Sequence, residues 1–391
     1  MIDYNDFLND TIVSLPPSGI RKFFDIANEM QDVISLSIGE PDFKTPWHVR
    51  EAGIESLERG RTWYSPNRGF AELREEISKY FSRRFYVDYD PKTDVLVSVG
   101  GSEAIDLAIR TLVTPGDDVL IVEPSFVCYR PMVIAAQGNP VIIQTKEKDS
   151  FKLTAEELQK SITPKTKLLI LPFPNNPTGA VMRENELLEI SKLVKEHNLM
   201  VISDEIYAEL TYGDAQHVAF SKLPDMKERS VIINGFSKSY AMTGWRLGYA
   251  VGPKEIISQM TKLHQYAVMC APTTAQYAAI EALKNGDRDI ARMRSEYDMR
   301  RRFIVDELRK IGFSCFEPEG AFYVFPNITI TGMTSEEFCC RLLETKHIAV
   351  IPGNAFGECG EGFVRISYSY SLKHIKEALS RIKEFVDEIL N

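Results

Sequence analysis

The sequence predicts an α/β protein with a large domain built on a mostly parallel sheet of seven strands and a smaller α+β domain. Two observations support this prediction. Short apolar runs rich in Val, Ile and Leu alternate with helical patterns between about residues 95 and 285, which is typical of a parallel sheet covered on both faces. The last third of the 391-residue chain instead begins with a long charged helical pattern and continues into separate strands.

The large domain has seven apolar runs that fit buried strands: 95–99, 118–122, 140–144, 167–172, 199–203, 230–234 and 247–251. Helical patterns follow several of them. Ligands of such sheets usually bind beyond the carboxyl ends of the strands. The polar motifs that directly follow these strands are therefore the candidate site.

The smaller domain is expected to begin with a charged helix over about 287–311. Further strands are expected at 321–325, 347–351 and 363–367, with helices near 334–346 and 371–390. The first 45 residues lack clear strand–helix alternation and are expected to pack with this domain. The predicted limits are 1–45 for the N-terminal segment, 46–285 for the large domain and 286–391 for the small domain.

Composition narrows the possible partners. The net charge of −9 argues against nucleic acid as the main partner. Six scattered cysteines without a CxxC pair favour a reduced, cytoplasmic protein. The start of the chain does not resemble a signal peptide, and the apolar runs fall short of the ~18 residues that a membrane span needs. Neither a membrane nor a metal is expected as a partner.

Lys238 lies in the stretch NGFSKSYAMTGWR, residues 234–246, directly after an apolar run. Small and apolar neighbours give a charged ammonium little stabilisation. They favour a lysine that becomes neutral and acts as a nucleophile. For a single lysine, a structural salt bridge is the alternative.

Two further motifs follow strands. In VGGSEA, residues 99–104, two glycines turn the chain and Ser102 is placed to cap a helix, so free N–H groups could bind phosphate; an ordinary strand–helix turn is the alternative. In LMVISDEIY, Asp204 could hold a positively charged ring nitrogen, and Tyr207 could reach the same ligand. The alternatives are a helix cap by Asp204 and the magnesium strand of a nucleotide hydrolase, but the sequence lacks a P-loop.

Three more side chains fit a ligand. Asn176 in PFPNNPTGA could donate to an anionic oxygen, and Phe126 in EPSFVCY could stack on a flat ring, although a plain loop and a core aromatic are the commoner outcomes. Arg365 lies in the apolar strand FVRIS, where a substrate carboxylate or an internal salt bridge could balance its charge.

These groups together match one cofactor. A phosphate-binding turn, an arginine that could also bind the phosphate (Arg246), an aspartate for a ring nitrogen and a stacking aromatic accompany one candidate nucleophile. A flat, cationic, phosphorylated aldehyde would use all of them. That cofactor is pyridoxal 5′-phosphate, bound to lysine as a Schiff base.

With these motifs in place, the chain strongly resembles the fold-type I, class I/II pyridoxal-phosphate-dependent aminotransferases. The resemblance is closest to the prokaryotic aspartate, alanine and aromatic aminotransferase subgroup and covers nearly the whole chain. It rests on NPTG, DExY and SKxxxMxGxR, which occur in this order.

The resemblance implies roles for individual residues. Lys238 is expected to bond to the cofactor and shuttle a proton, and Asp204 to pair with the pyridine nitrogen. Asn176 and Tyr207 are expected to donate to the phenolic oxygen, and Phe126 to stack on the ring. The catalytic residues would be Lys238, Asp204 and Tyr207.

The resemblance also implies how the phosphate and the substrate are bound. The phosphate group would be bound by Gly101, Ser102, Glu103, Ser237 and Arg246, and by Tyr64 of a neighbouring subunit. Some relatives have a serine at the position of Gly235, so Ser237 is expected to supply that hydroxyl. The substrate would be bound by Gly39, Asn176 and Arg365.

The expected activity is ping-pong transfer of an amino group to a 2-oxo acid, with 2-oxoglutarate as the expected acceptor. Aromatic amino acids, aspartate and alanine are the candidate donors. A cysteine-S-conjugate β-lyase of the same fold is the alternative, and a transcription regulator would need a DNA-binding module. Sites shared between subunits imply a homodimer.

Overall fold

The computed structural model describes residues 2–17, 19, 30 and 32–390. Its large sheet has the strand order β2-β8-β7-β6-β5-β3-β4. The strands are β2 (Val95–Ser98), β3 (Asp118–Glu123), β4 (Asn139–Gln144), β5 (Thr166–Leu171), β6 (Met200–Asp204), β7 (Ser230–Gly235) and β8 (Gly248–Val251). The predicted seven-stranded, mostly parallel sheet is confirmed.

One strand departs from the parallel arrangement. β8 runs antiparallel to both of its neighbours, β7 and β2. The connection from β7 to β8 contains only the short 3₁₀ helix η5 (Thr243–Trp245), and a parallel return would need a longer crossover, usually a helix. The loop that carries Lys238 therefore lies in a turn between two antiparallel strands.

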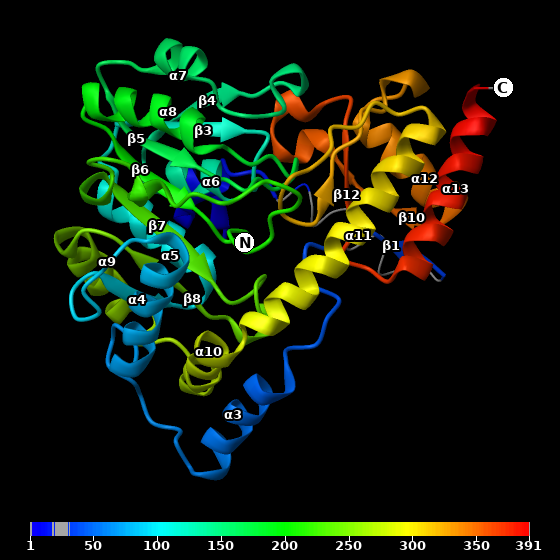
Figure 1. The fold of residues 1–391 in the computed structure, drawn as a ribbon. Helices are drawn as coiled ribbons and strands as arrows, with labels where there is room; N and C mark the ends of the chain where they lie inside the picture. Colours follow the sequence, from blue (N-terminus) through cyan, green and yellow to red (C-terminus); the bar gives the residue numbers. More distant parts are fainter. Residues whose placement is uncertain (1, 18, 20–29, 31, 391) are drawn as a thin grey trace.

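The strands are buried on both faces, as their continuous apolar runs predict. Leu168 and Ile170 of β5 belong to one hydrophobic cluster, whereas Leu169 and Leu171 belong to the other. This alternation follows from the two-residue period of a strand. The helices that lie over the sheet (Figure 1) are α4 (Ala71–Phe85), α5 (Gly100–Leu112), α6 (Tyr129–Ala135), α7 (Ala155–Ser161), α8 (Glu184–Glu196) and α9 (Lys254–Ala267). α10 (Thr273–Asn285) packs against α4, and α3 (Trp47–Glu58) packs against α10.

The C-terminal part contains two small sheets. β9 (Tyr323–Val324), β11 (Ile351–Pro352) and β12 (Val364–Ser367) form an antiparallel sheet in the order β11-β12-β9, and β1 (Ile34–Ser35) pairs in parallel with β10 (Ile348–Ala349). The helices are α11 (Asp287–Ile311), α12 (Ser335–Lys346) and α13 (Leu372–Leu390). Figure 1 shows α11 running from the large sheet's helices to α13. The N-terminal strand β1 thus joins the C-terminal part, while the domain limits themselves stay predictions.

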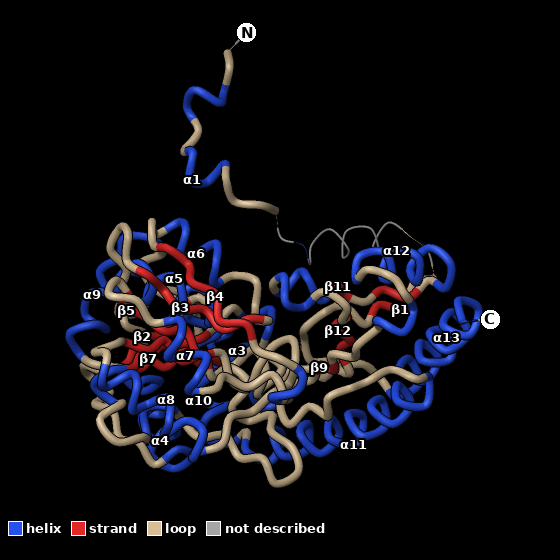
Figure 2. Tube along the Cα trace, turned by 90° about the horizontal axis from the view of Figure 1, so that it is seen from above, coloured by secondary structure: helices blue, strands red, loops and turns tan. Residues whose placement is uncertain are grey.

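The remaining elements are short. The first described residues form η1 (Tyr4–Phe7) and α1 (Asp10–Val13). In Figure 2 the N-terminal end extends away from the main body of the molecule, while α1 contacts α6. The other 3₁₀ helices are η2 (Glu147–Asp149), η3 (Phe220–Lys222), η4 (Lys227–Arg229), η6 (Thr329–Thr331), η7 (Gly353–Phe356) and η8 (Glu358–Gly360). Within the described residues, no helix combines the length and apolar character that crossing a membrane requires.

Candidate active site

A cavity of about 690 Å³ brings most of the predicted site residues together. It receives side chains from the carboxyl ends of the large sheet's strands and from β9 and β12. The predicted residues that line it are Gly39, Gly101, Ser102, Phe126, Asn176, Asp204, Tyr207, Ser237, Lys238, Arg246 and Arg365. Glu103 and Tyr64 are outside this lining.

Lys238 extends from the loop after β7 into the cavity. Its Nζ donates to the carbonyl oxygen of Gly39 at 2.5 Å. Removal from water, reinforced by the positive charge of Arg365, lowers the pKa of Lys238 to about 8. Among the described residues, no carboxylate forms an ion pair with Lys238. The alternative that Lys238 forms a structural salt bridge with one of these residues is therefore wrong. A lysine with this pKa has a large neutral fraction at mildly basic pH and can act as a nucleophile.

We predict that cofactor-free protein combines with pyridoxal phosphate at a rate that follows this pKa. The neutral amine attacks the aldehyde, so the rate constant should rise with pH and reach half its maximum near pH 8. Stopped-flow absorbance over a pH series measures it. A midpoint at the ordinary lysine value of about 10.4 would contradict the lowered pKa of Lys238.

Asp204 lies buried at the end of β6. Its Oδ1 accepts the N–H of Ile206 at 3.2 Å, and its Oδ2 accepts the hydroxyl of Tyr129 at 2.6 Å. Burial raises the pKa of Asp204, whereas the bond from Tyr129 favours the ionised form. No helix begins here, so the helix-cap alternative is wrong. Tyr129 was missed at the sequence level, although it lies three residues after Phe126 in the motif EPSFVCY.

Arg365 is the clearest sign of an anionic ligand. It is only 3% exposed in β12, and its Nη atoms donate to the Asn176 side-chain oxygen at 2.9 Å and the Ser37 carbonyl at 2.6 Å. Its Nε is buried and has no partner among the described residues. Among the described residues, Arg365 therefore does not form the internal salt bridge that was the alternative for it. A carboxylate substrate would supply the missing negative charge.

Tyr323 of β9 connects the groups on this side of the cavity. Its hydroxyl lies 2.8 Å from the hydroxyl of Tyr207, and its ring lies 4.5 Å from the Arg365 guanidinium. A Cβ atom at position 39 would lie 2.2 Å from the Tyr323 hydroxyl, so only glycine fits there. The sequence showed Tyr323 only as part of a strand, without a signal for this role.

The opposite end of the cavity is suited to a phosphate. Helix α5 starts at Gly100 without a capping side chain, so the Ser102 cap was wrong: Ser102 lies inside the first turn. Gly100 has φ +79, and a Cβ there would lie 2.7 Å from Nη2 of Arg246. Open N–H groups at a helix N-terminus, next to a guanidinium and the lining residue Ser237, form an anion cradle.

Glu103 is placed differently from the expectation, whereas the expected role of Tyr64 in a neighbouring subunit stays a prediction. The Glu103 side chain bonds to the Val99 N–H and to His264 rather than lining the cavity. Its carboxylate is held by these donors because the first turn of α5 directs it toward α9. Tyr64 is 76% exposed and lies outside this chain's cavity.

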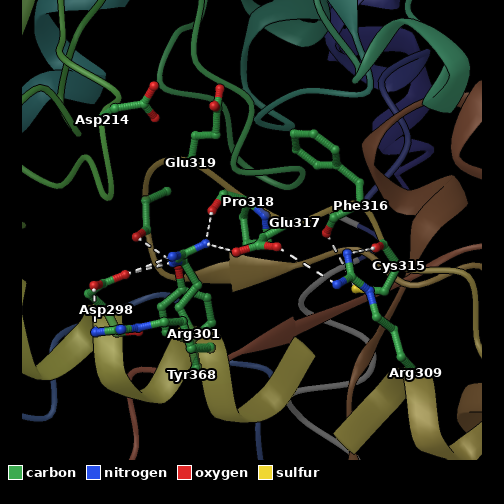
Figure 3. A network of polar contacts seen from close by, with 12 residues as sticks. Asp214, Asp298, Arg301, Arg309, Cys315, Phe316, Glu317, Pro318, Glu319 and Tyr368 are labelled. Atoms are coloured by element: carbon green, nitrogen blue, oxygen red, sulfur yellow. Dashed lines mark hydrogen bonds and ion pairs between the residues drawn. The ribbon is translucent and has the colours of Figure 1, made fainter. Parts of the chain in front are cut away.

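A polar network supports the loop that carries Asn176 (Figure 3). Arg301 of α11 donates to Glu317 at 2.7 Å and to the Pro318 carbonyl at 3.1 Å. The next two residues, Glu319 and Gly320, donate their N–H groups to the carbonyl of Gly179 in the NPTG motif. The segment after α11 therefore fixes the loop from which Asn176 reaches Arg365.

Comparison with known proteins identifies the family. The model of the family "Aminotransferase class I and II" matches residues 31–382. The chain belongs to this family. It is 50% identical to a putative aminotransferase, YugH, of Bacillus subtilis and 44% identical to an aspartate aminotransferase of Pyrococcus abyssi, each match covering 97% of this chain and 98% of the relative.

Solved structures agree with this assignment. An aromatic aminotransferase from Pyrococcus horikoshii superimposes with a TM-score of 0.90 at 44% identity, covering 94% of this chain and 99% of that one. The predicted fold, enzyme class and aminotransferase activity are thus confirmed, and the findings do not support the β-lyase alternative.

Aminotransferases of this type use pyridoxal phosphate, and the cavity fits it. A lysine of lowered pKa, a buried aspartate and an uncapped helix end beside Arg246 are the three groups that an aldehyde, a ring nitrogen and a phosphate require.

Proposed function

We propose that this aminotransferase takes its amino group from an aromatic amino acid and passes it to 2-oxoglutarate. The observation that carries this choice is the apolar part of the cavity wall, which includes Ile38, Val127 and Pro174. The basic residues among its described lining are Lys238, Arg246 and Arg365, and each already has a proposed partner. An aromatic side chain therefore finds more apolar contact at this wall than the side chain of aspartate does. The choice of 2-oxoglutarate as acceptor rests on the resemblance to the aminotransferase subgroup and not on this wall.

We assign roles that follow from the contacts. Arg365 and Asn176 would hold the substrate α-carboxylate. The neutral Lys238 would remove the Cα proton and return it to the carbon on the other side of the substrate's nitrogen. The bound cofactor supplies a conjugated ring that accepts electrons from the Cα atom. Asp204, held by Tyr129, would keep the ring nitrogen protonated, and Tyr207 would donate to the phenolic oxygen.

We predict that a panel of donors, each assayed with 2-oxoglutarate, ranks phenylalanine and tyrosine above aspartate and alanine in kcat/KM. We expect kcat/KM to differ by about 10-fold or more, because differences in apolar contact between two substrates in a pocket usually change kcat/KM by at least that factor. The oxo acid product is measured directly. Each donor is also tested with pyruvate as acceptor, which separates donor preference from acceptor preference. Aspartate as the best donor would overturn the proposal.

We also propose a homodimer that shares its active sites. Trp63, Tyr64 and Tyr266 are 63%, 76% and 87% exposed. The described N-terminal residues add Tyr4 and Phe7 at 71% and 78%. Large exposed aromatic side chains favour a protein interface, and a second copy of the chain would cover them and bring Tyr64 to a neighbouring phosphate cradle.

We predict that two impaired variants complement each other. Lys238→Ala and Tyr64→Ala subunits, mixed and allowed to exchange, would form heterodimers with one intact site. Activity should then return to about a quarter of the wild-type value, since half of the dimers carry one of two sites. Each variant alone and a mixture without exchange are the controls. No recovery despite proven exchange would contradict the shared site.

We further propose that the enzyme is cytoplasmic. The six cysteines all lie in the described part of the chain and form no disulfide there, which fits a reducing compartment. Cell fractionation would test this location.

A further inference from the structure

His264 is a buried, titratable residue outside the cavity. It lies in α9, is 0% exposed, and has Nδ1 at 2.8 Å from Oε1 of Glu103. Its Nε2 is buried and has no partner among the described residues. A hydrogen on Nε2 would be left without an acceptor there, which is costly. The proton therefore belongs on Nδ1, which donates to Glu103.

Glu103 acts at the start of the phosphate cradle. Its second oxygen, Oε2, accepts the backbone N–H of Val99 at 2.5 Å. Val99 directly precedes Gly100, the first residue of α5, and has no side chain that could cap the helix. The two oxygens of Glu103 thus have one donor each, Val99 N–H and His264 Nδ1–H.

The Glu103 carboxylate lies where it could compete with a phosphate for the N–H groups at the start of α5. A carboxylate in the first turn of a helix is attracted by the same N–H groups and dipole that attract a phosphate. If Oε1 lost its partner, the side chain could turn toward the open N–H groups of Gly101 and Ser102. The Glu103 carboxylate would then accept hydrogen bonds from the N–H groups that we propose for the cofactor's phosphate.

We propose that His264 is a positioning residue for the cofactor's phosphate. Its Nδ1–H holds Glu103 on Val99 and so keeps the N–H groups of the following turn available. The Glu103 side chain itself does not contact the phosphate, because it accepts the N–H of Val99 and so stabilises the start of α5. This inference rests on the proposed phosphate cradle, and His264 acts only through Glu103.

The experiment measures the affinity of cofactor-free protein for pyridoxal phosphate and for pyridoxal, which lacks the phosphate. His264→Leu should weaken binding of pyridoxal phosphate about 10-fold, in line with a lost hydrogen bond to a charged group, and should leave the affinity for pyridoxal within about 2-fold. Inorganic phosphate should also compete less well in this variant. Wild-type protein that binds both compounds equally would instead refute the cradle itself.

Two matched variants separate positioning from packing. His264→Asn places an amide N–H near the position of Nδ1 and should restore binding of pyridoxal phosphate. His264→Gln extends its amide toward the position of Nε2, which has no partner, and should bind as weakly as His264→Leu. Unchanged affinity for pyridoxal phosphate in His264→Leu, or equal losses for both compounds, would overturn the proposal. Circular dichroism and thermal unfolding confirm that each variant is folded.

Discussion

Replacing Lys238 by alanine should lower turnover by at least about 10²- to 10⁴-fold, the usual contribution of a positioned general base. The loss of the covalent bond to the cofactor adds to this effect. The variant should also lack the absorbance band of lysine-bound cofactor and resist labelling by borohydride, because position 238 no longer offers an amine. Steady-state kinetics and absorbance spectra measure the two effects.

Lys262→Ala is the matched control, since Lys262 is exposed on α9 and donates, within the part of the chain that the structure describes, to the Gln259 side chain alone. It should keep wild-type turnover and absorbance. An alanine variant at position 238 that retains normal turnover would refute the assignment of Lys238 as nucleophile and proton carrier.

Replacing Arg365 by lysine should lower kcat/KM for amino acid donors by about 10- to 100-fold, the range expected for hydrogen bonds to a charged group. A lysine keeps the positive charge but cannot reproduce the planar fork that grips a carboxylate with two N–H groups. The main change should appear in KM, because the clamp binds a group that does not react. Initial-rate kinetics with the preferred donor measure the effect.

An amine without the α-carboxylate provides the control for Arg365. Wild-type protein and the lysine variant should process this poor substrate at similar rates, since neither can use the clamp. An equal loss for the amine and the amino acid would show that the substitution disturbs the cavity in general and would contradict the specific role.

The sequence was informative where a motif brings its chemistry together locally. Lys238 and Arg246 lie in one stretch after β7, and Asp204 and Tyr207 lie in another at the end of β6. Because these strands are neighbours in the sheet, residues just beyond their ends meet at one edge. The alternation of apolar runs and helices predicted a parallel sheet with its motifs at one edge, although it did not predict which strands are neighbours.

The sequence was less informative for side-chain direction. Glu103 belongs to the phosphate motif by position, but its carboxylate turns toward Val99 and His264, and the histidine lies 161 residues further along the chain. Ser102 was expected to cap α5, but the helix begins two residues earlier. Successive side chains of a helix point about 100° apart, since a turn holds 3.6 residues. An error of one residue in the predicted helix start therefore changes the direction assigned to each side chain near that end.

The sequence by itself determined the strands of the large sheet, the glycine turn and the family, and it singled out Lys238 as the candidate nucleophile, because each depends on residue type and short spacing. The expected strand 347–351 was wrong: it is divided into β10 and β11, which belong to different sheets. The tertiary structure alone decided which partners these groups have: Tyr129 for Asp204, Tyr323 for Tyr207, and Asn176 for Arg365, pairs separated by 75, 116 and 189 residues. Such contacts depend on strand order and on how the C-terminal part packs against the large sheet. A local pattern of residues carries no information about either.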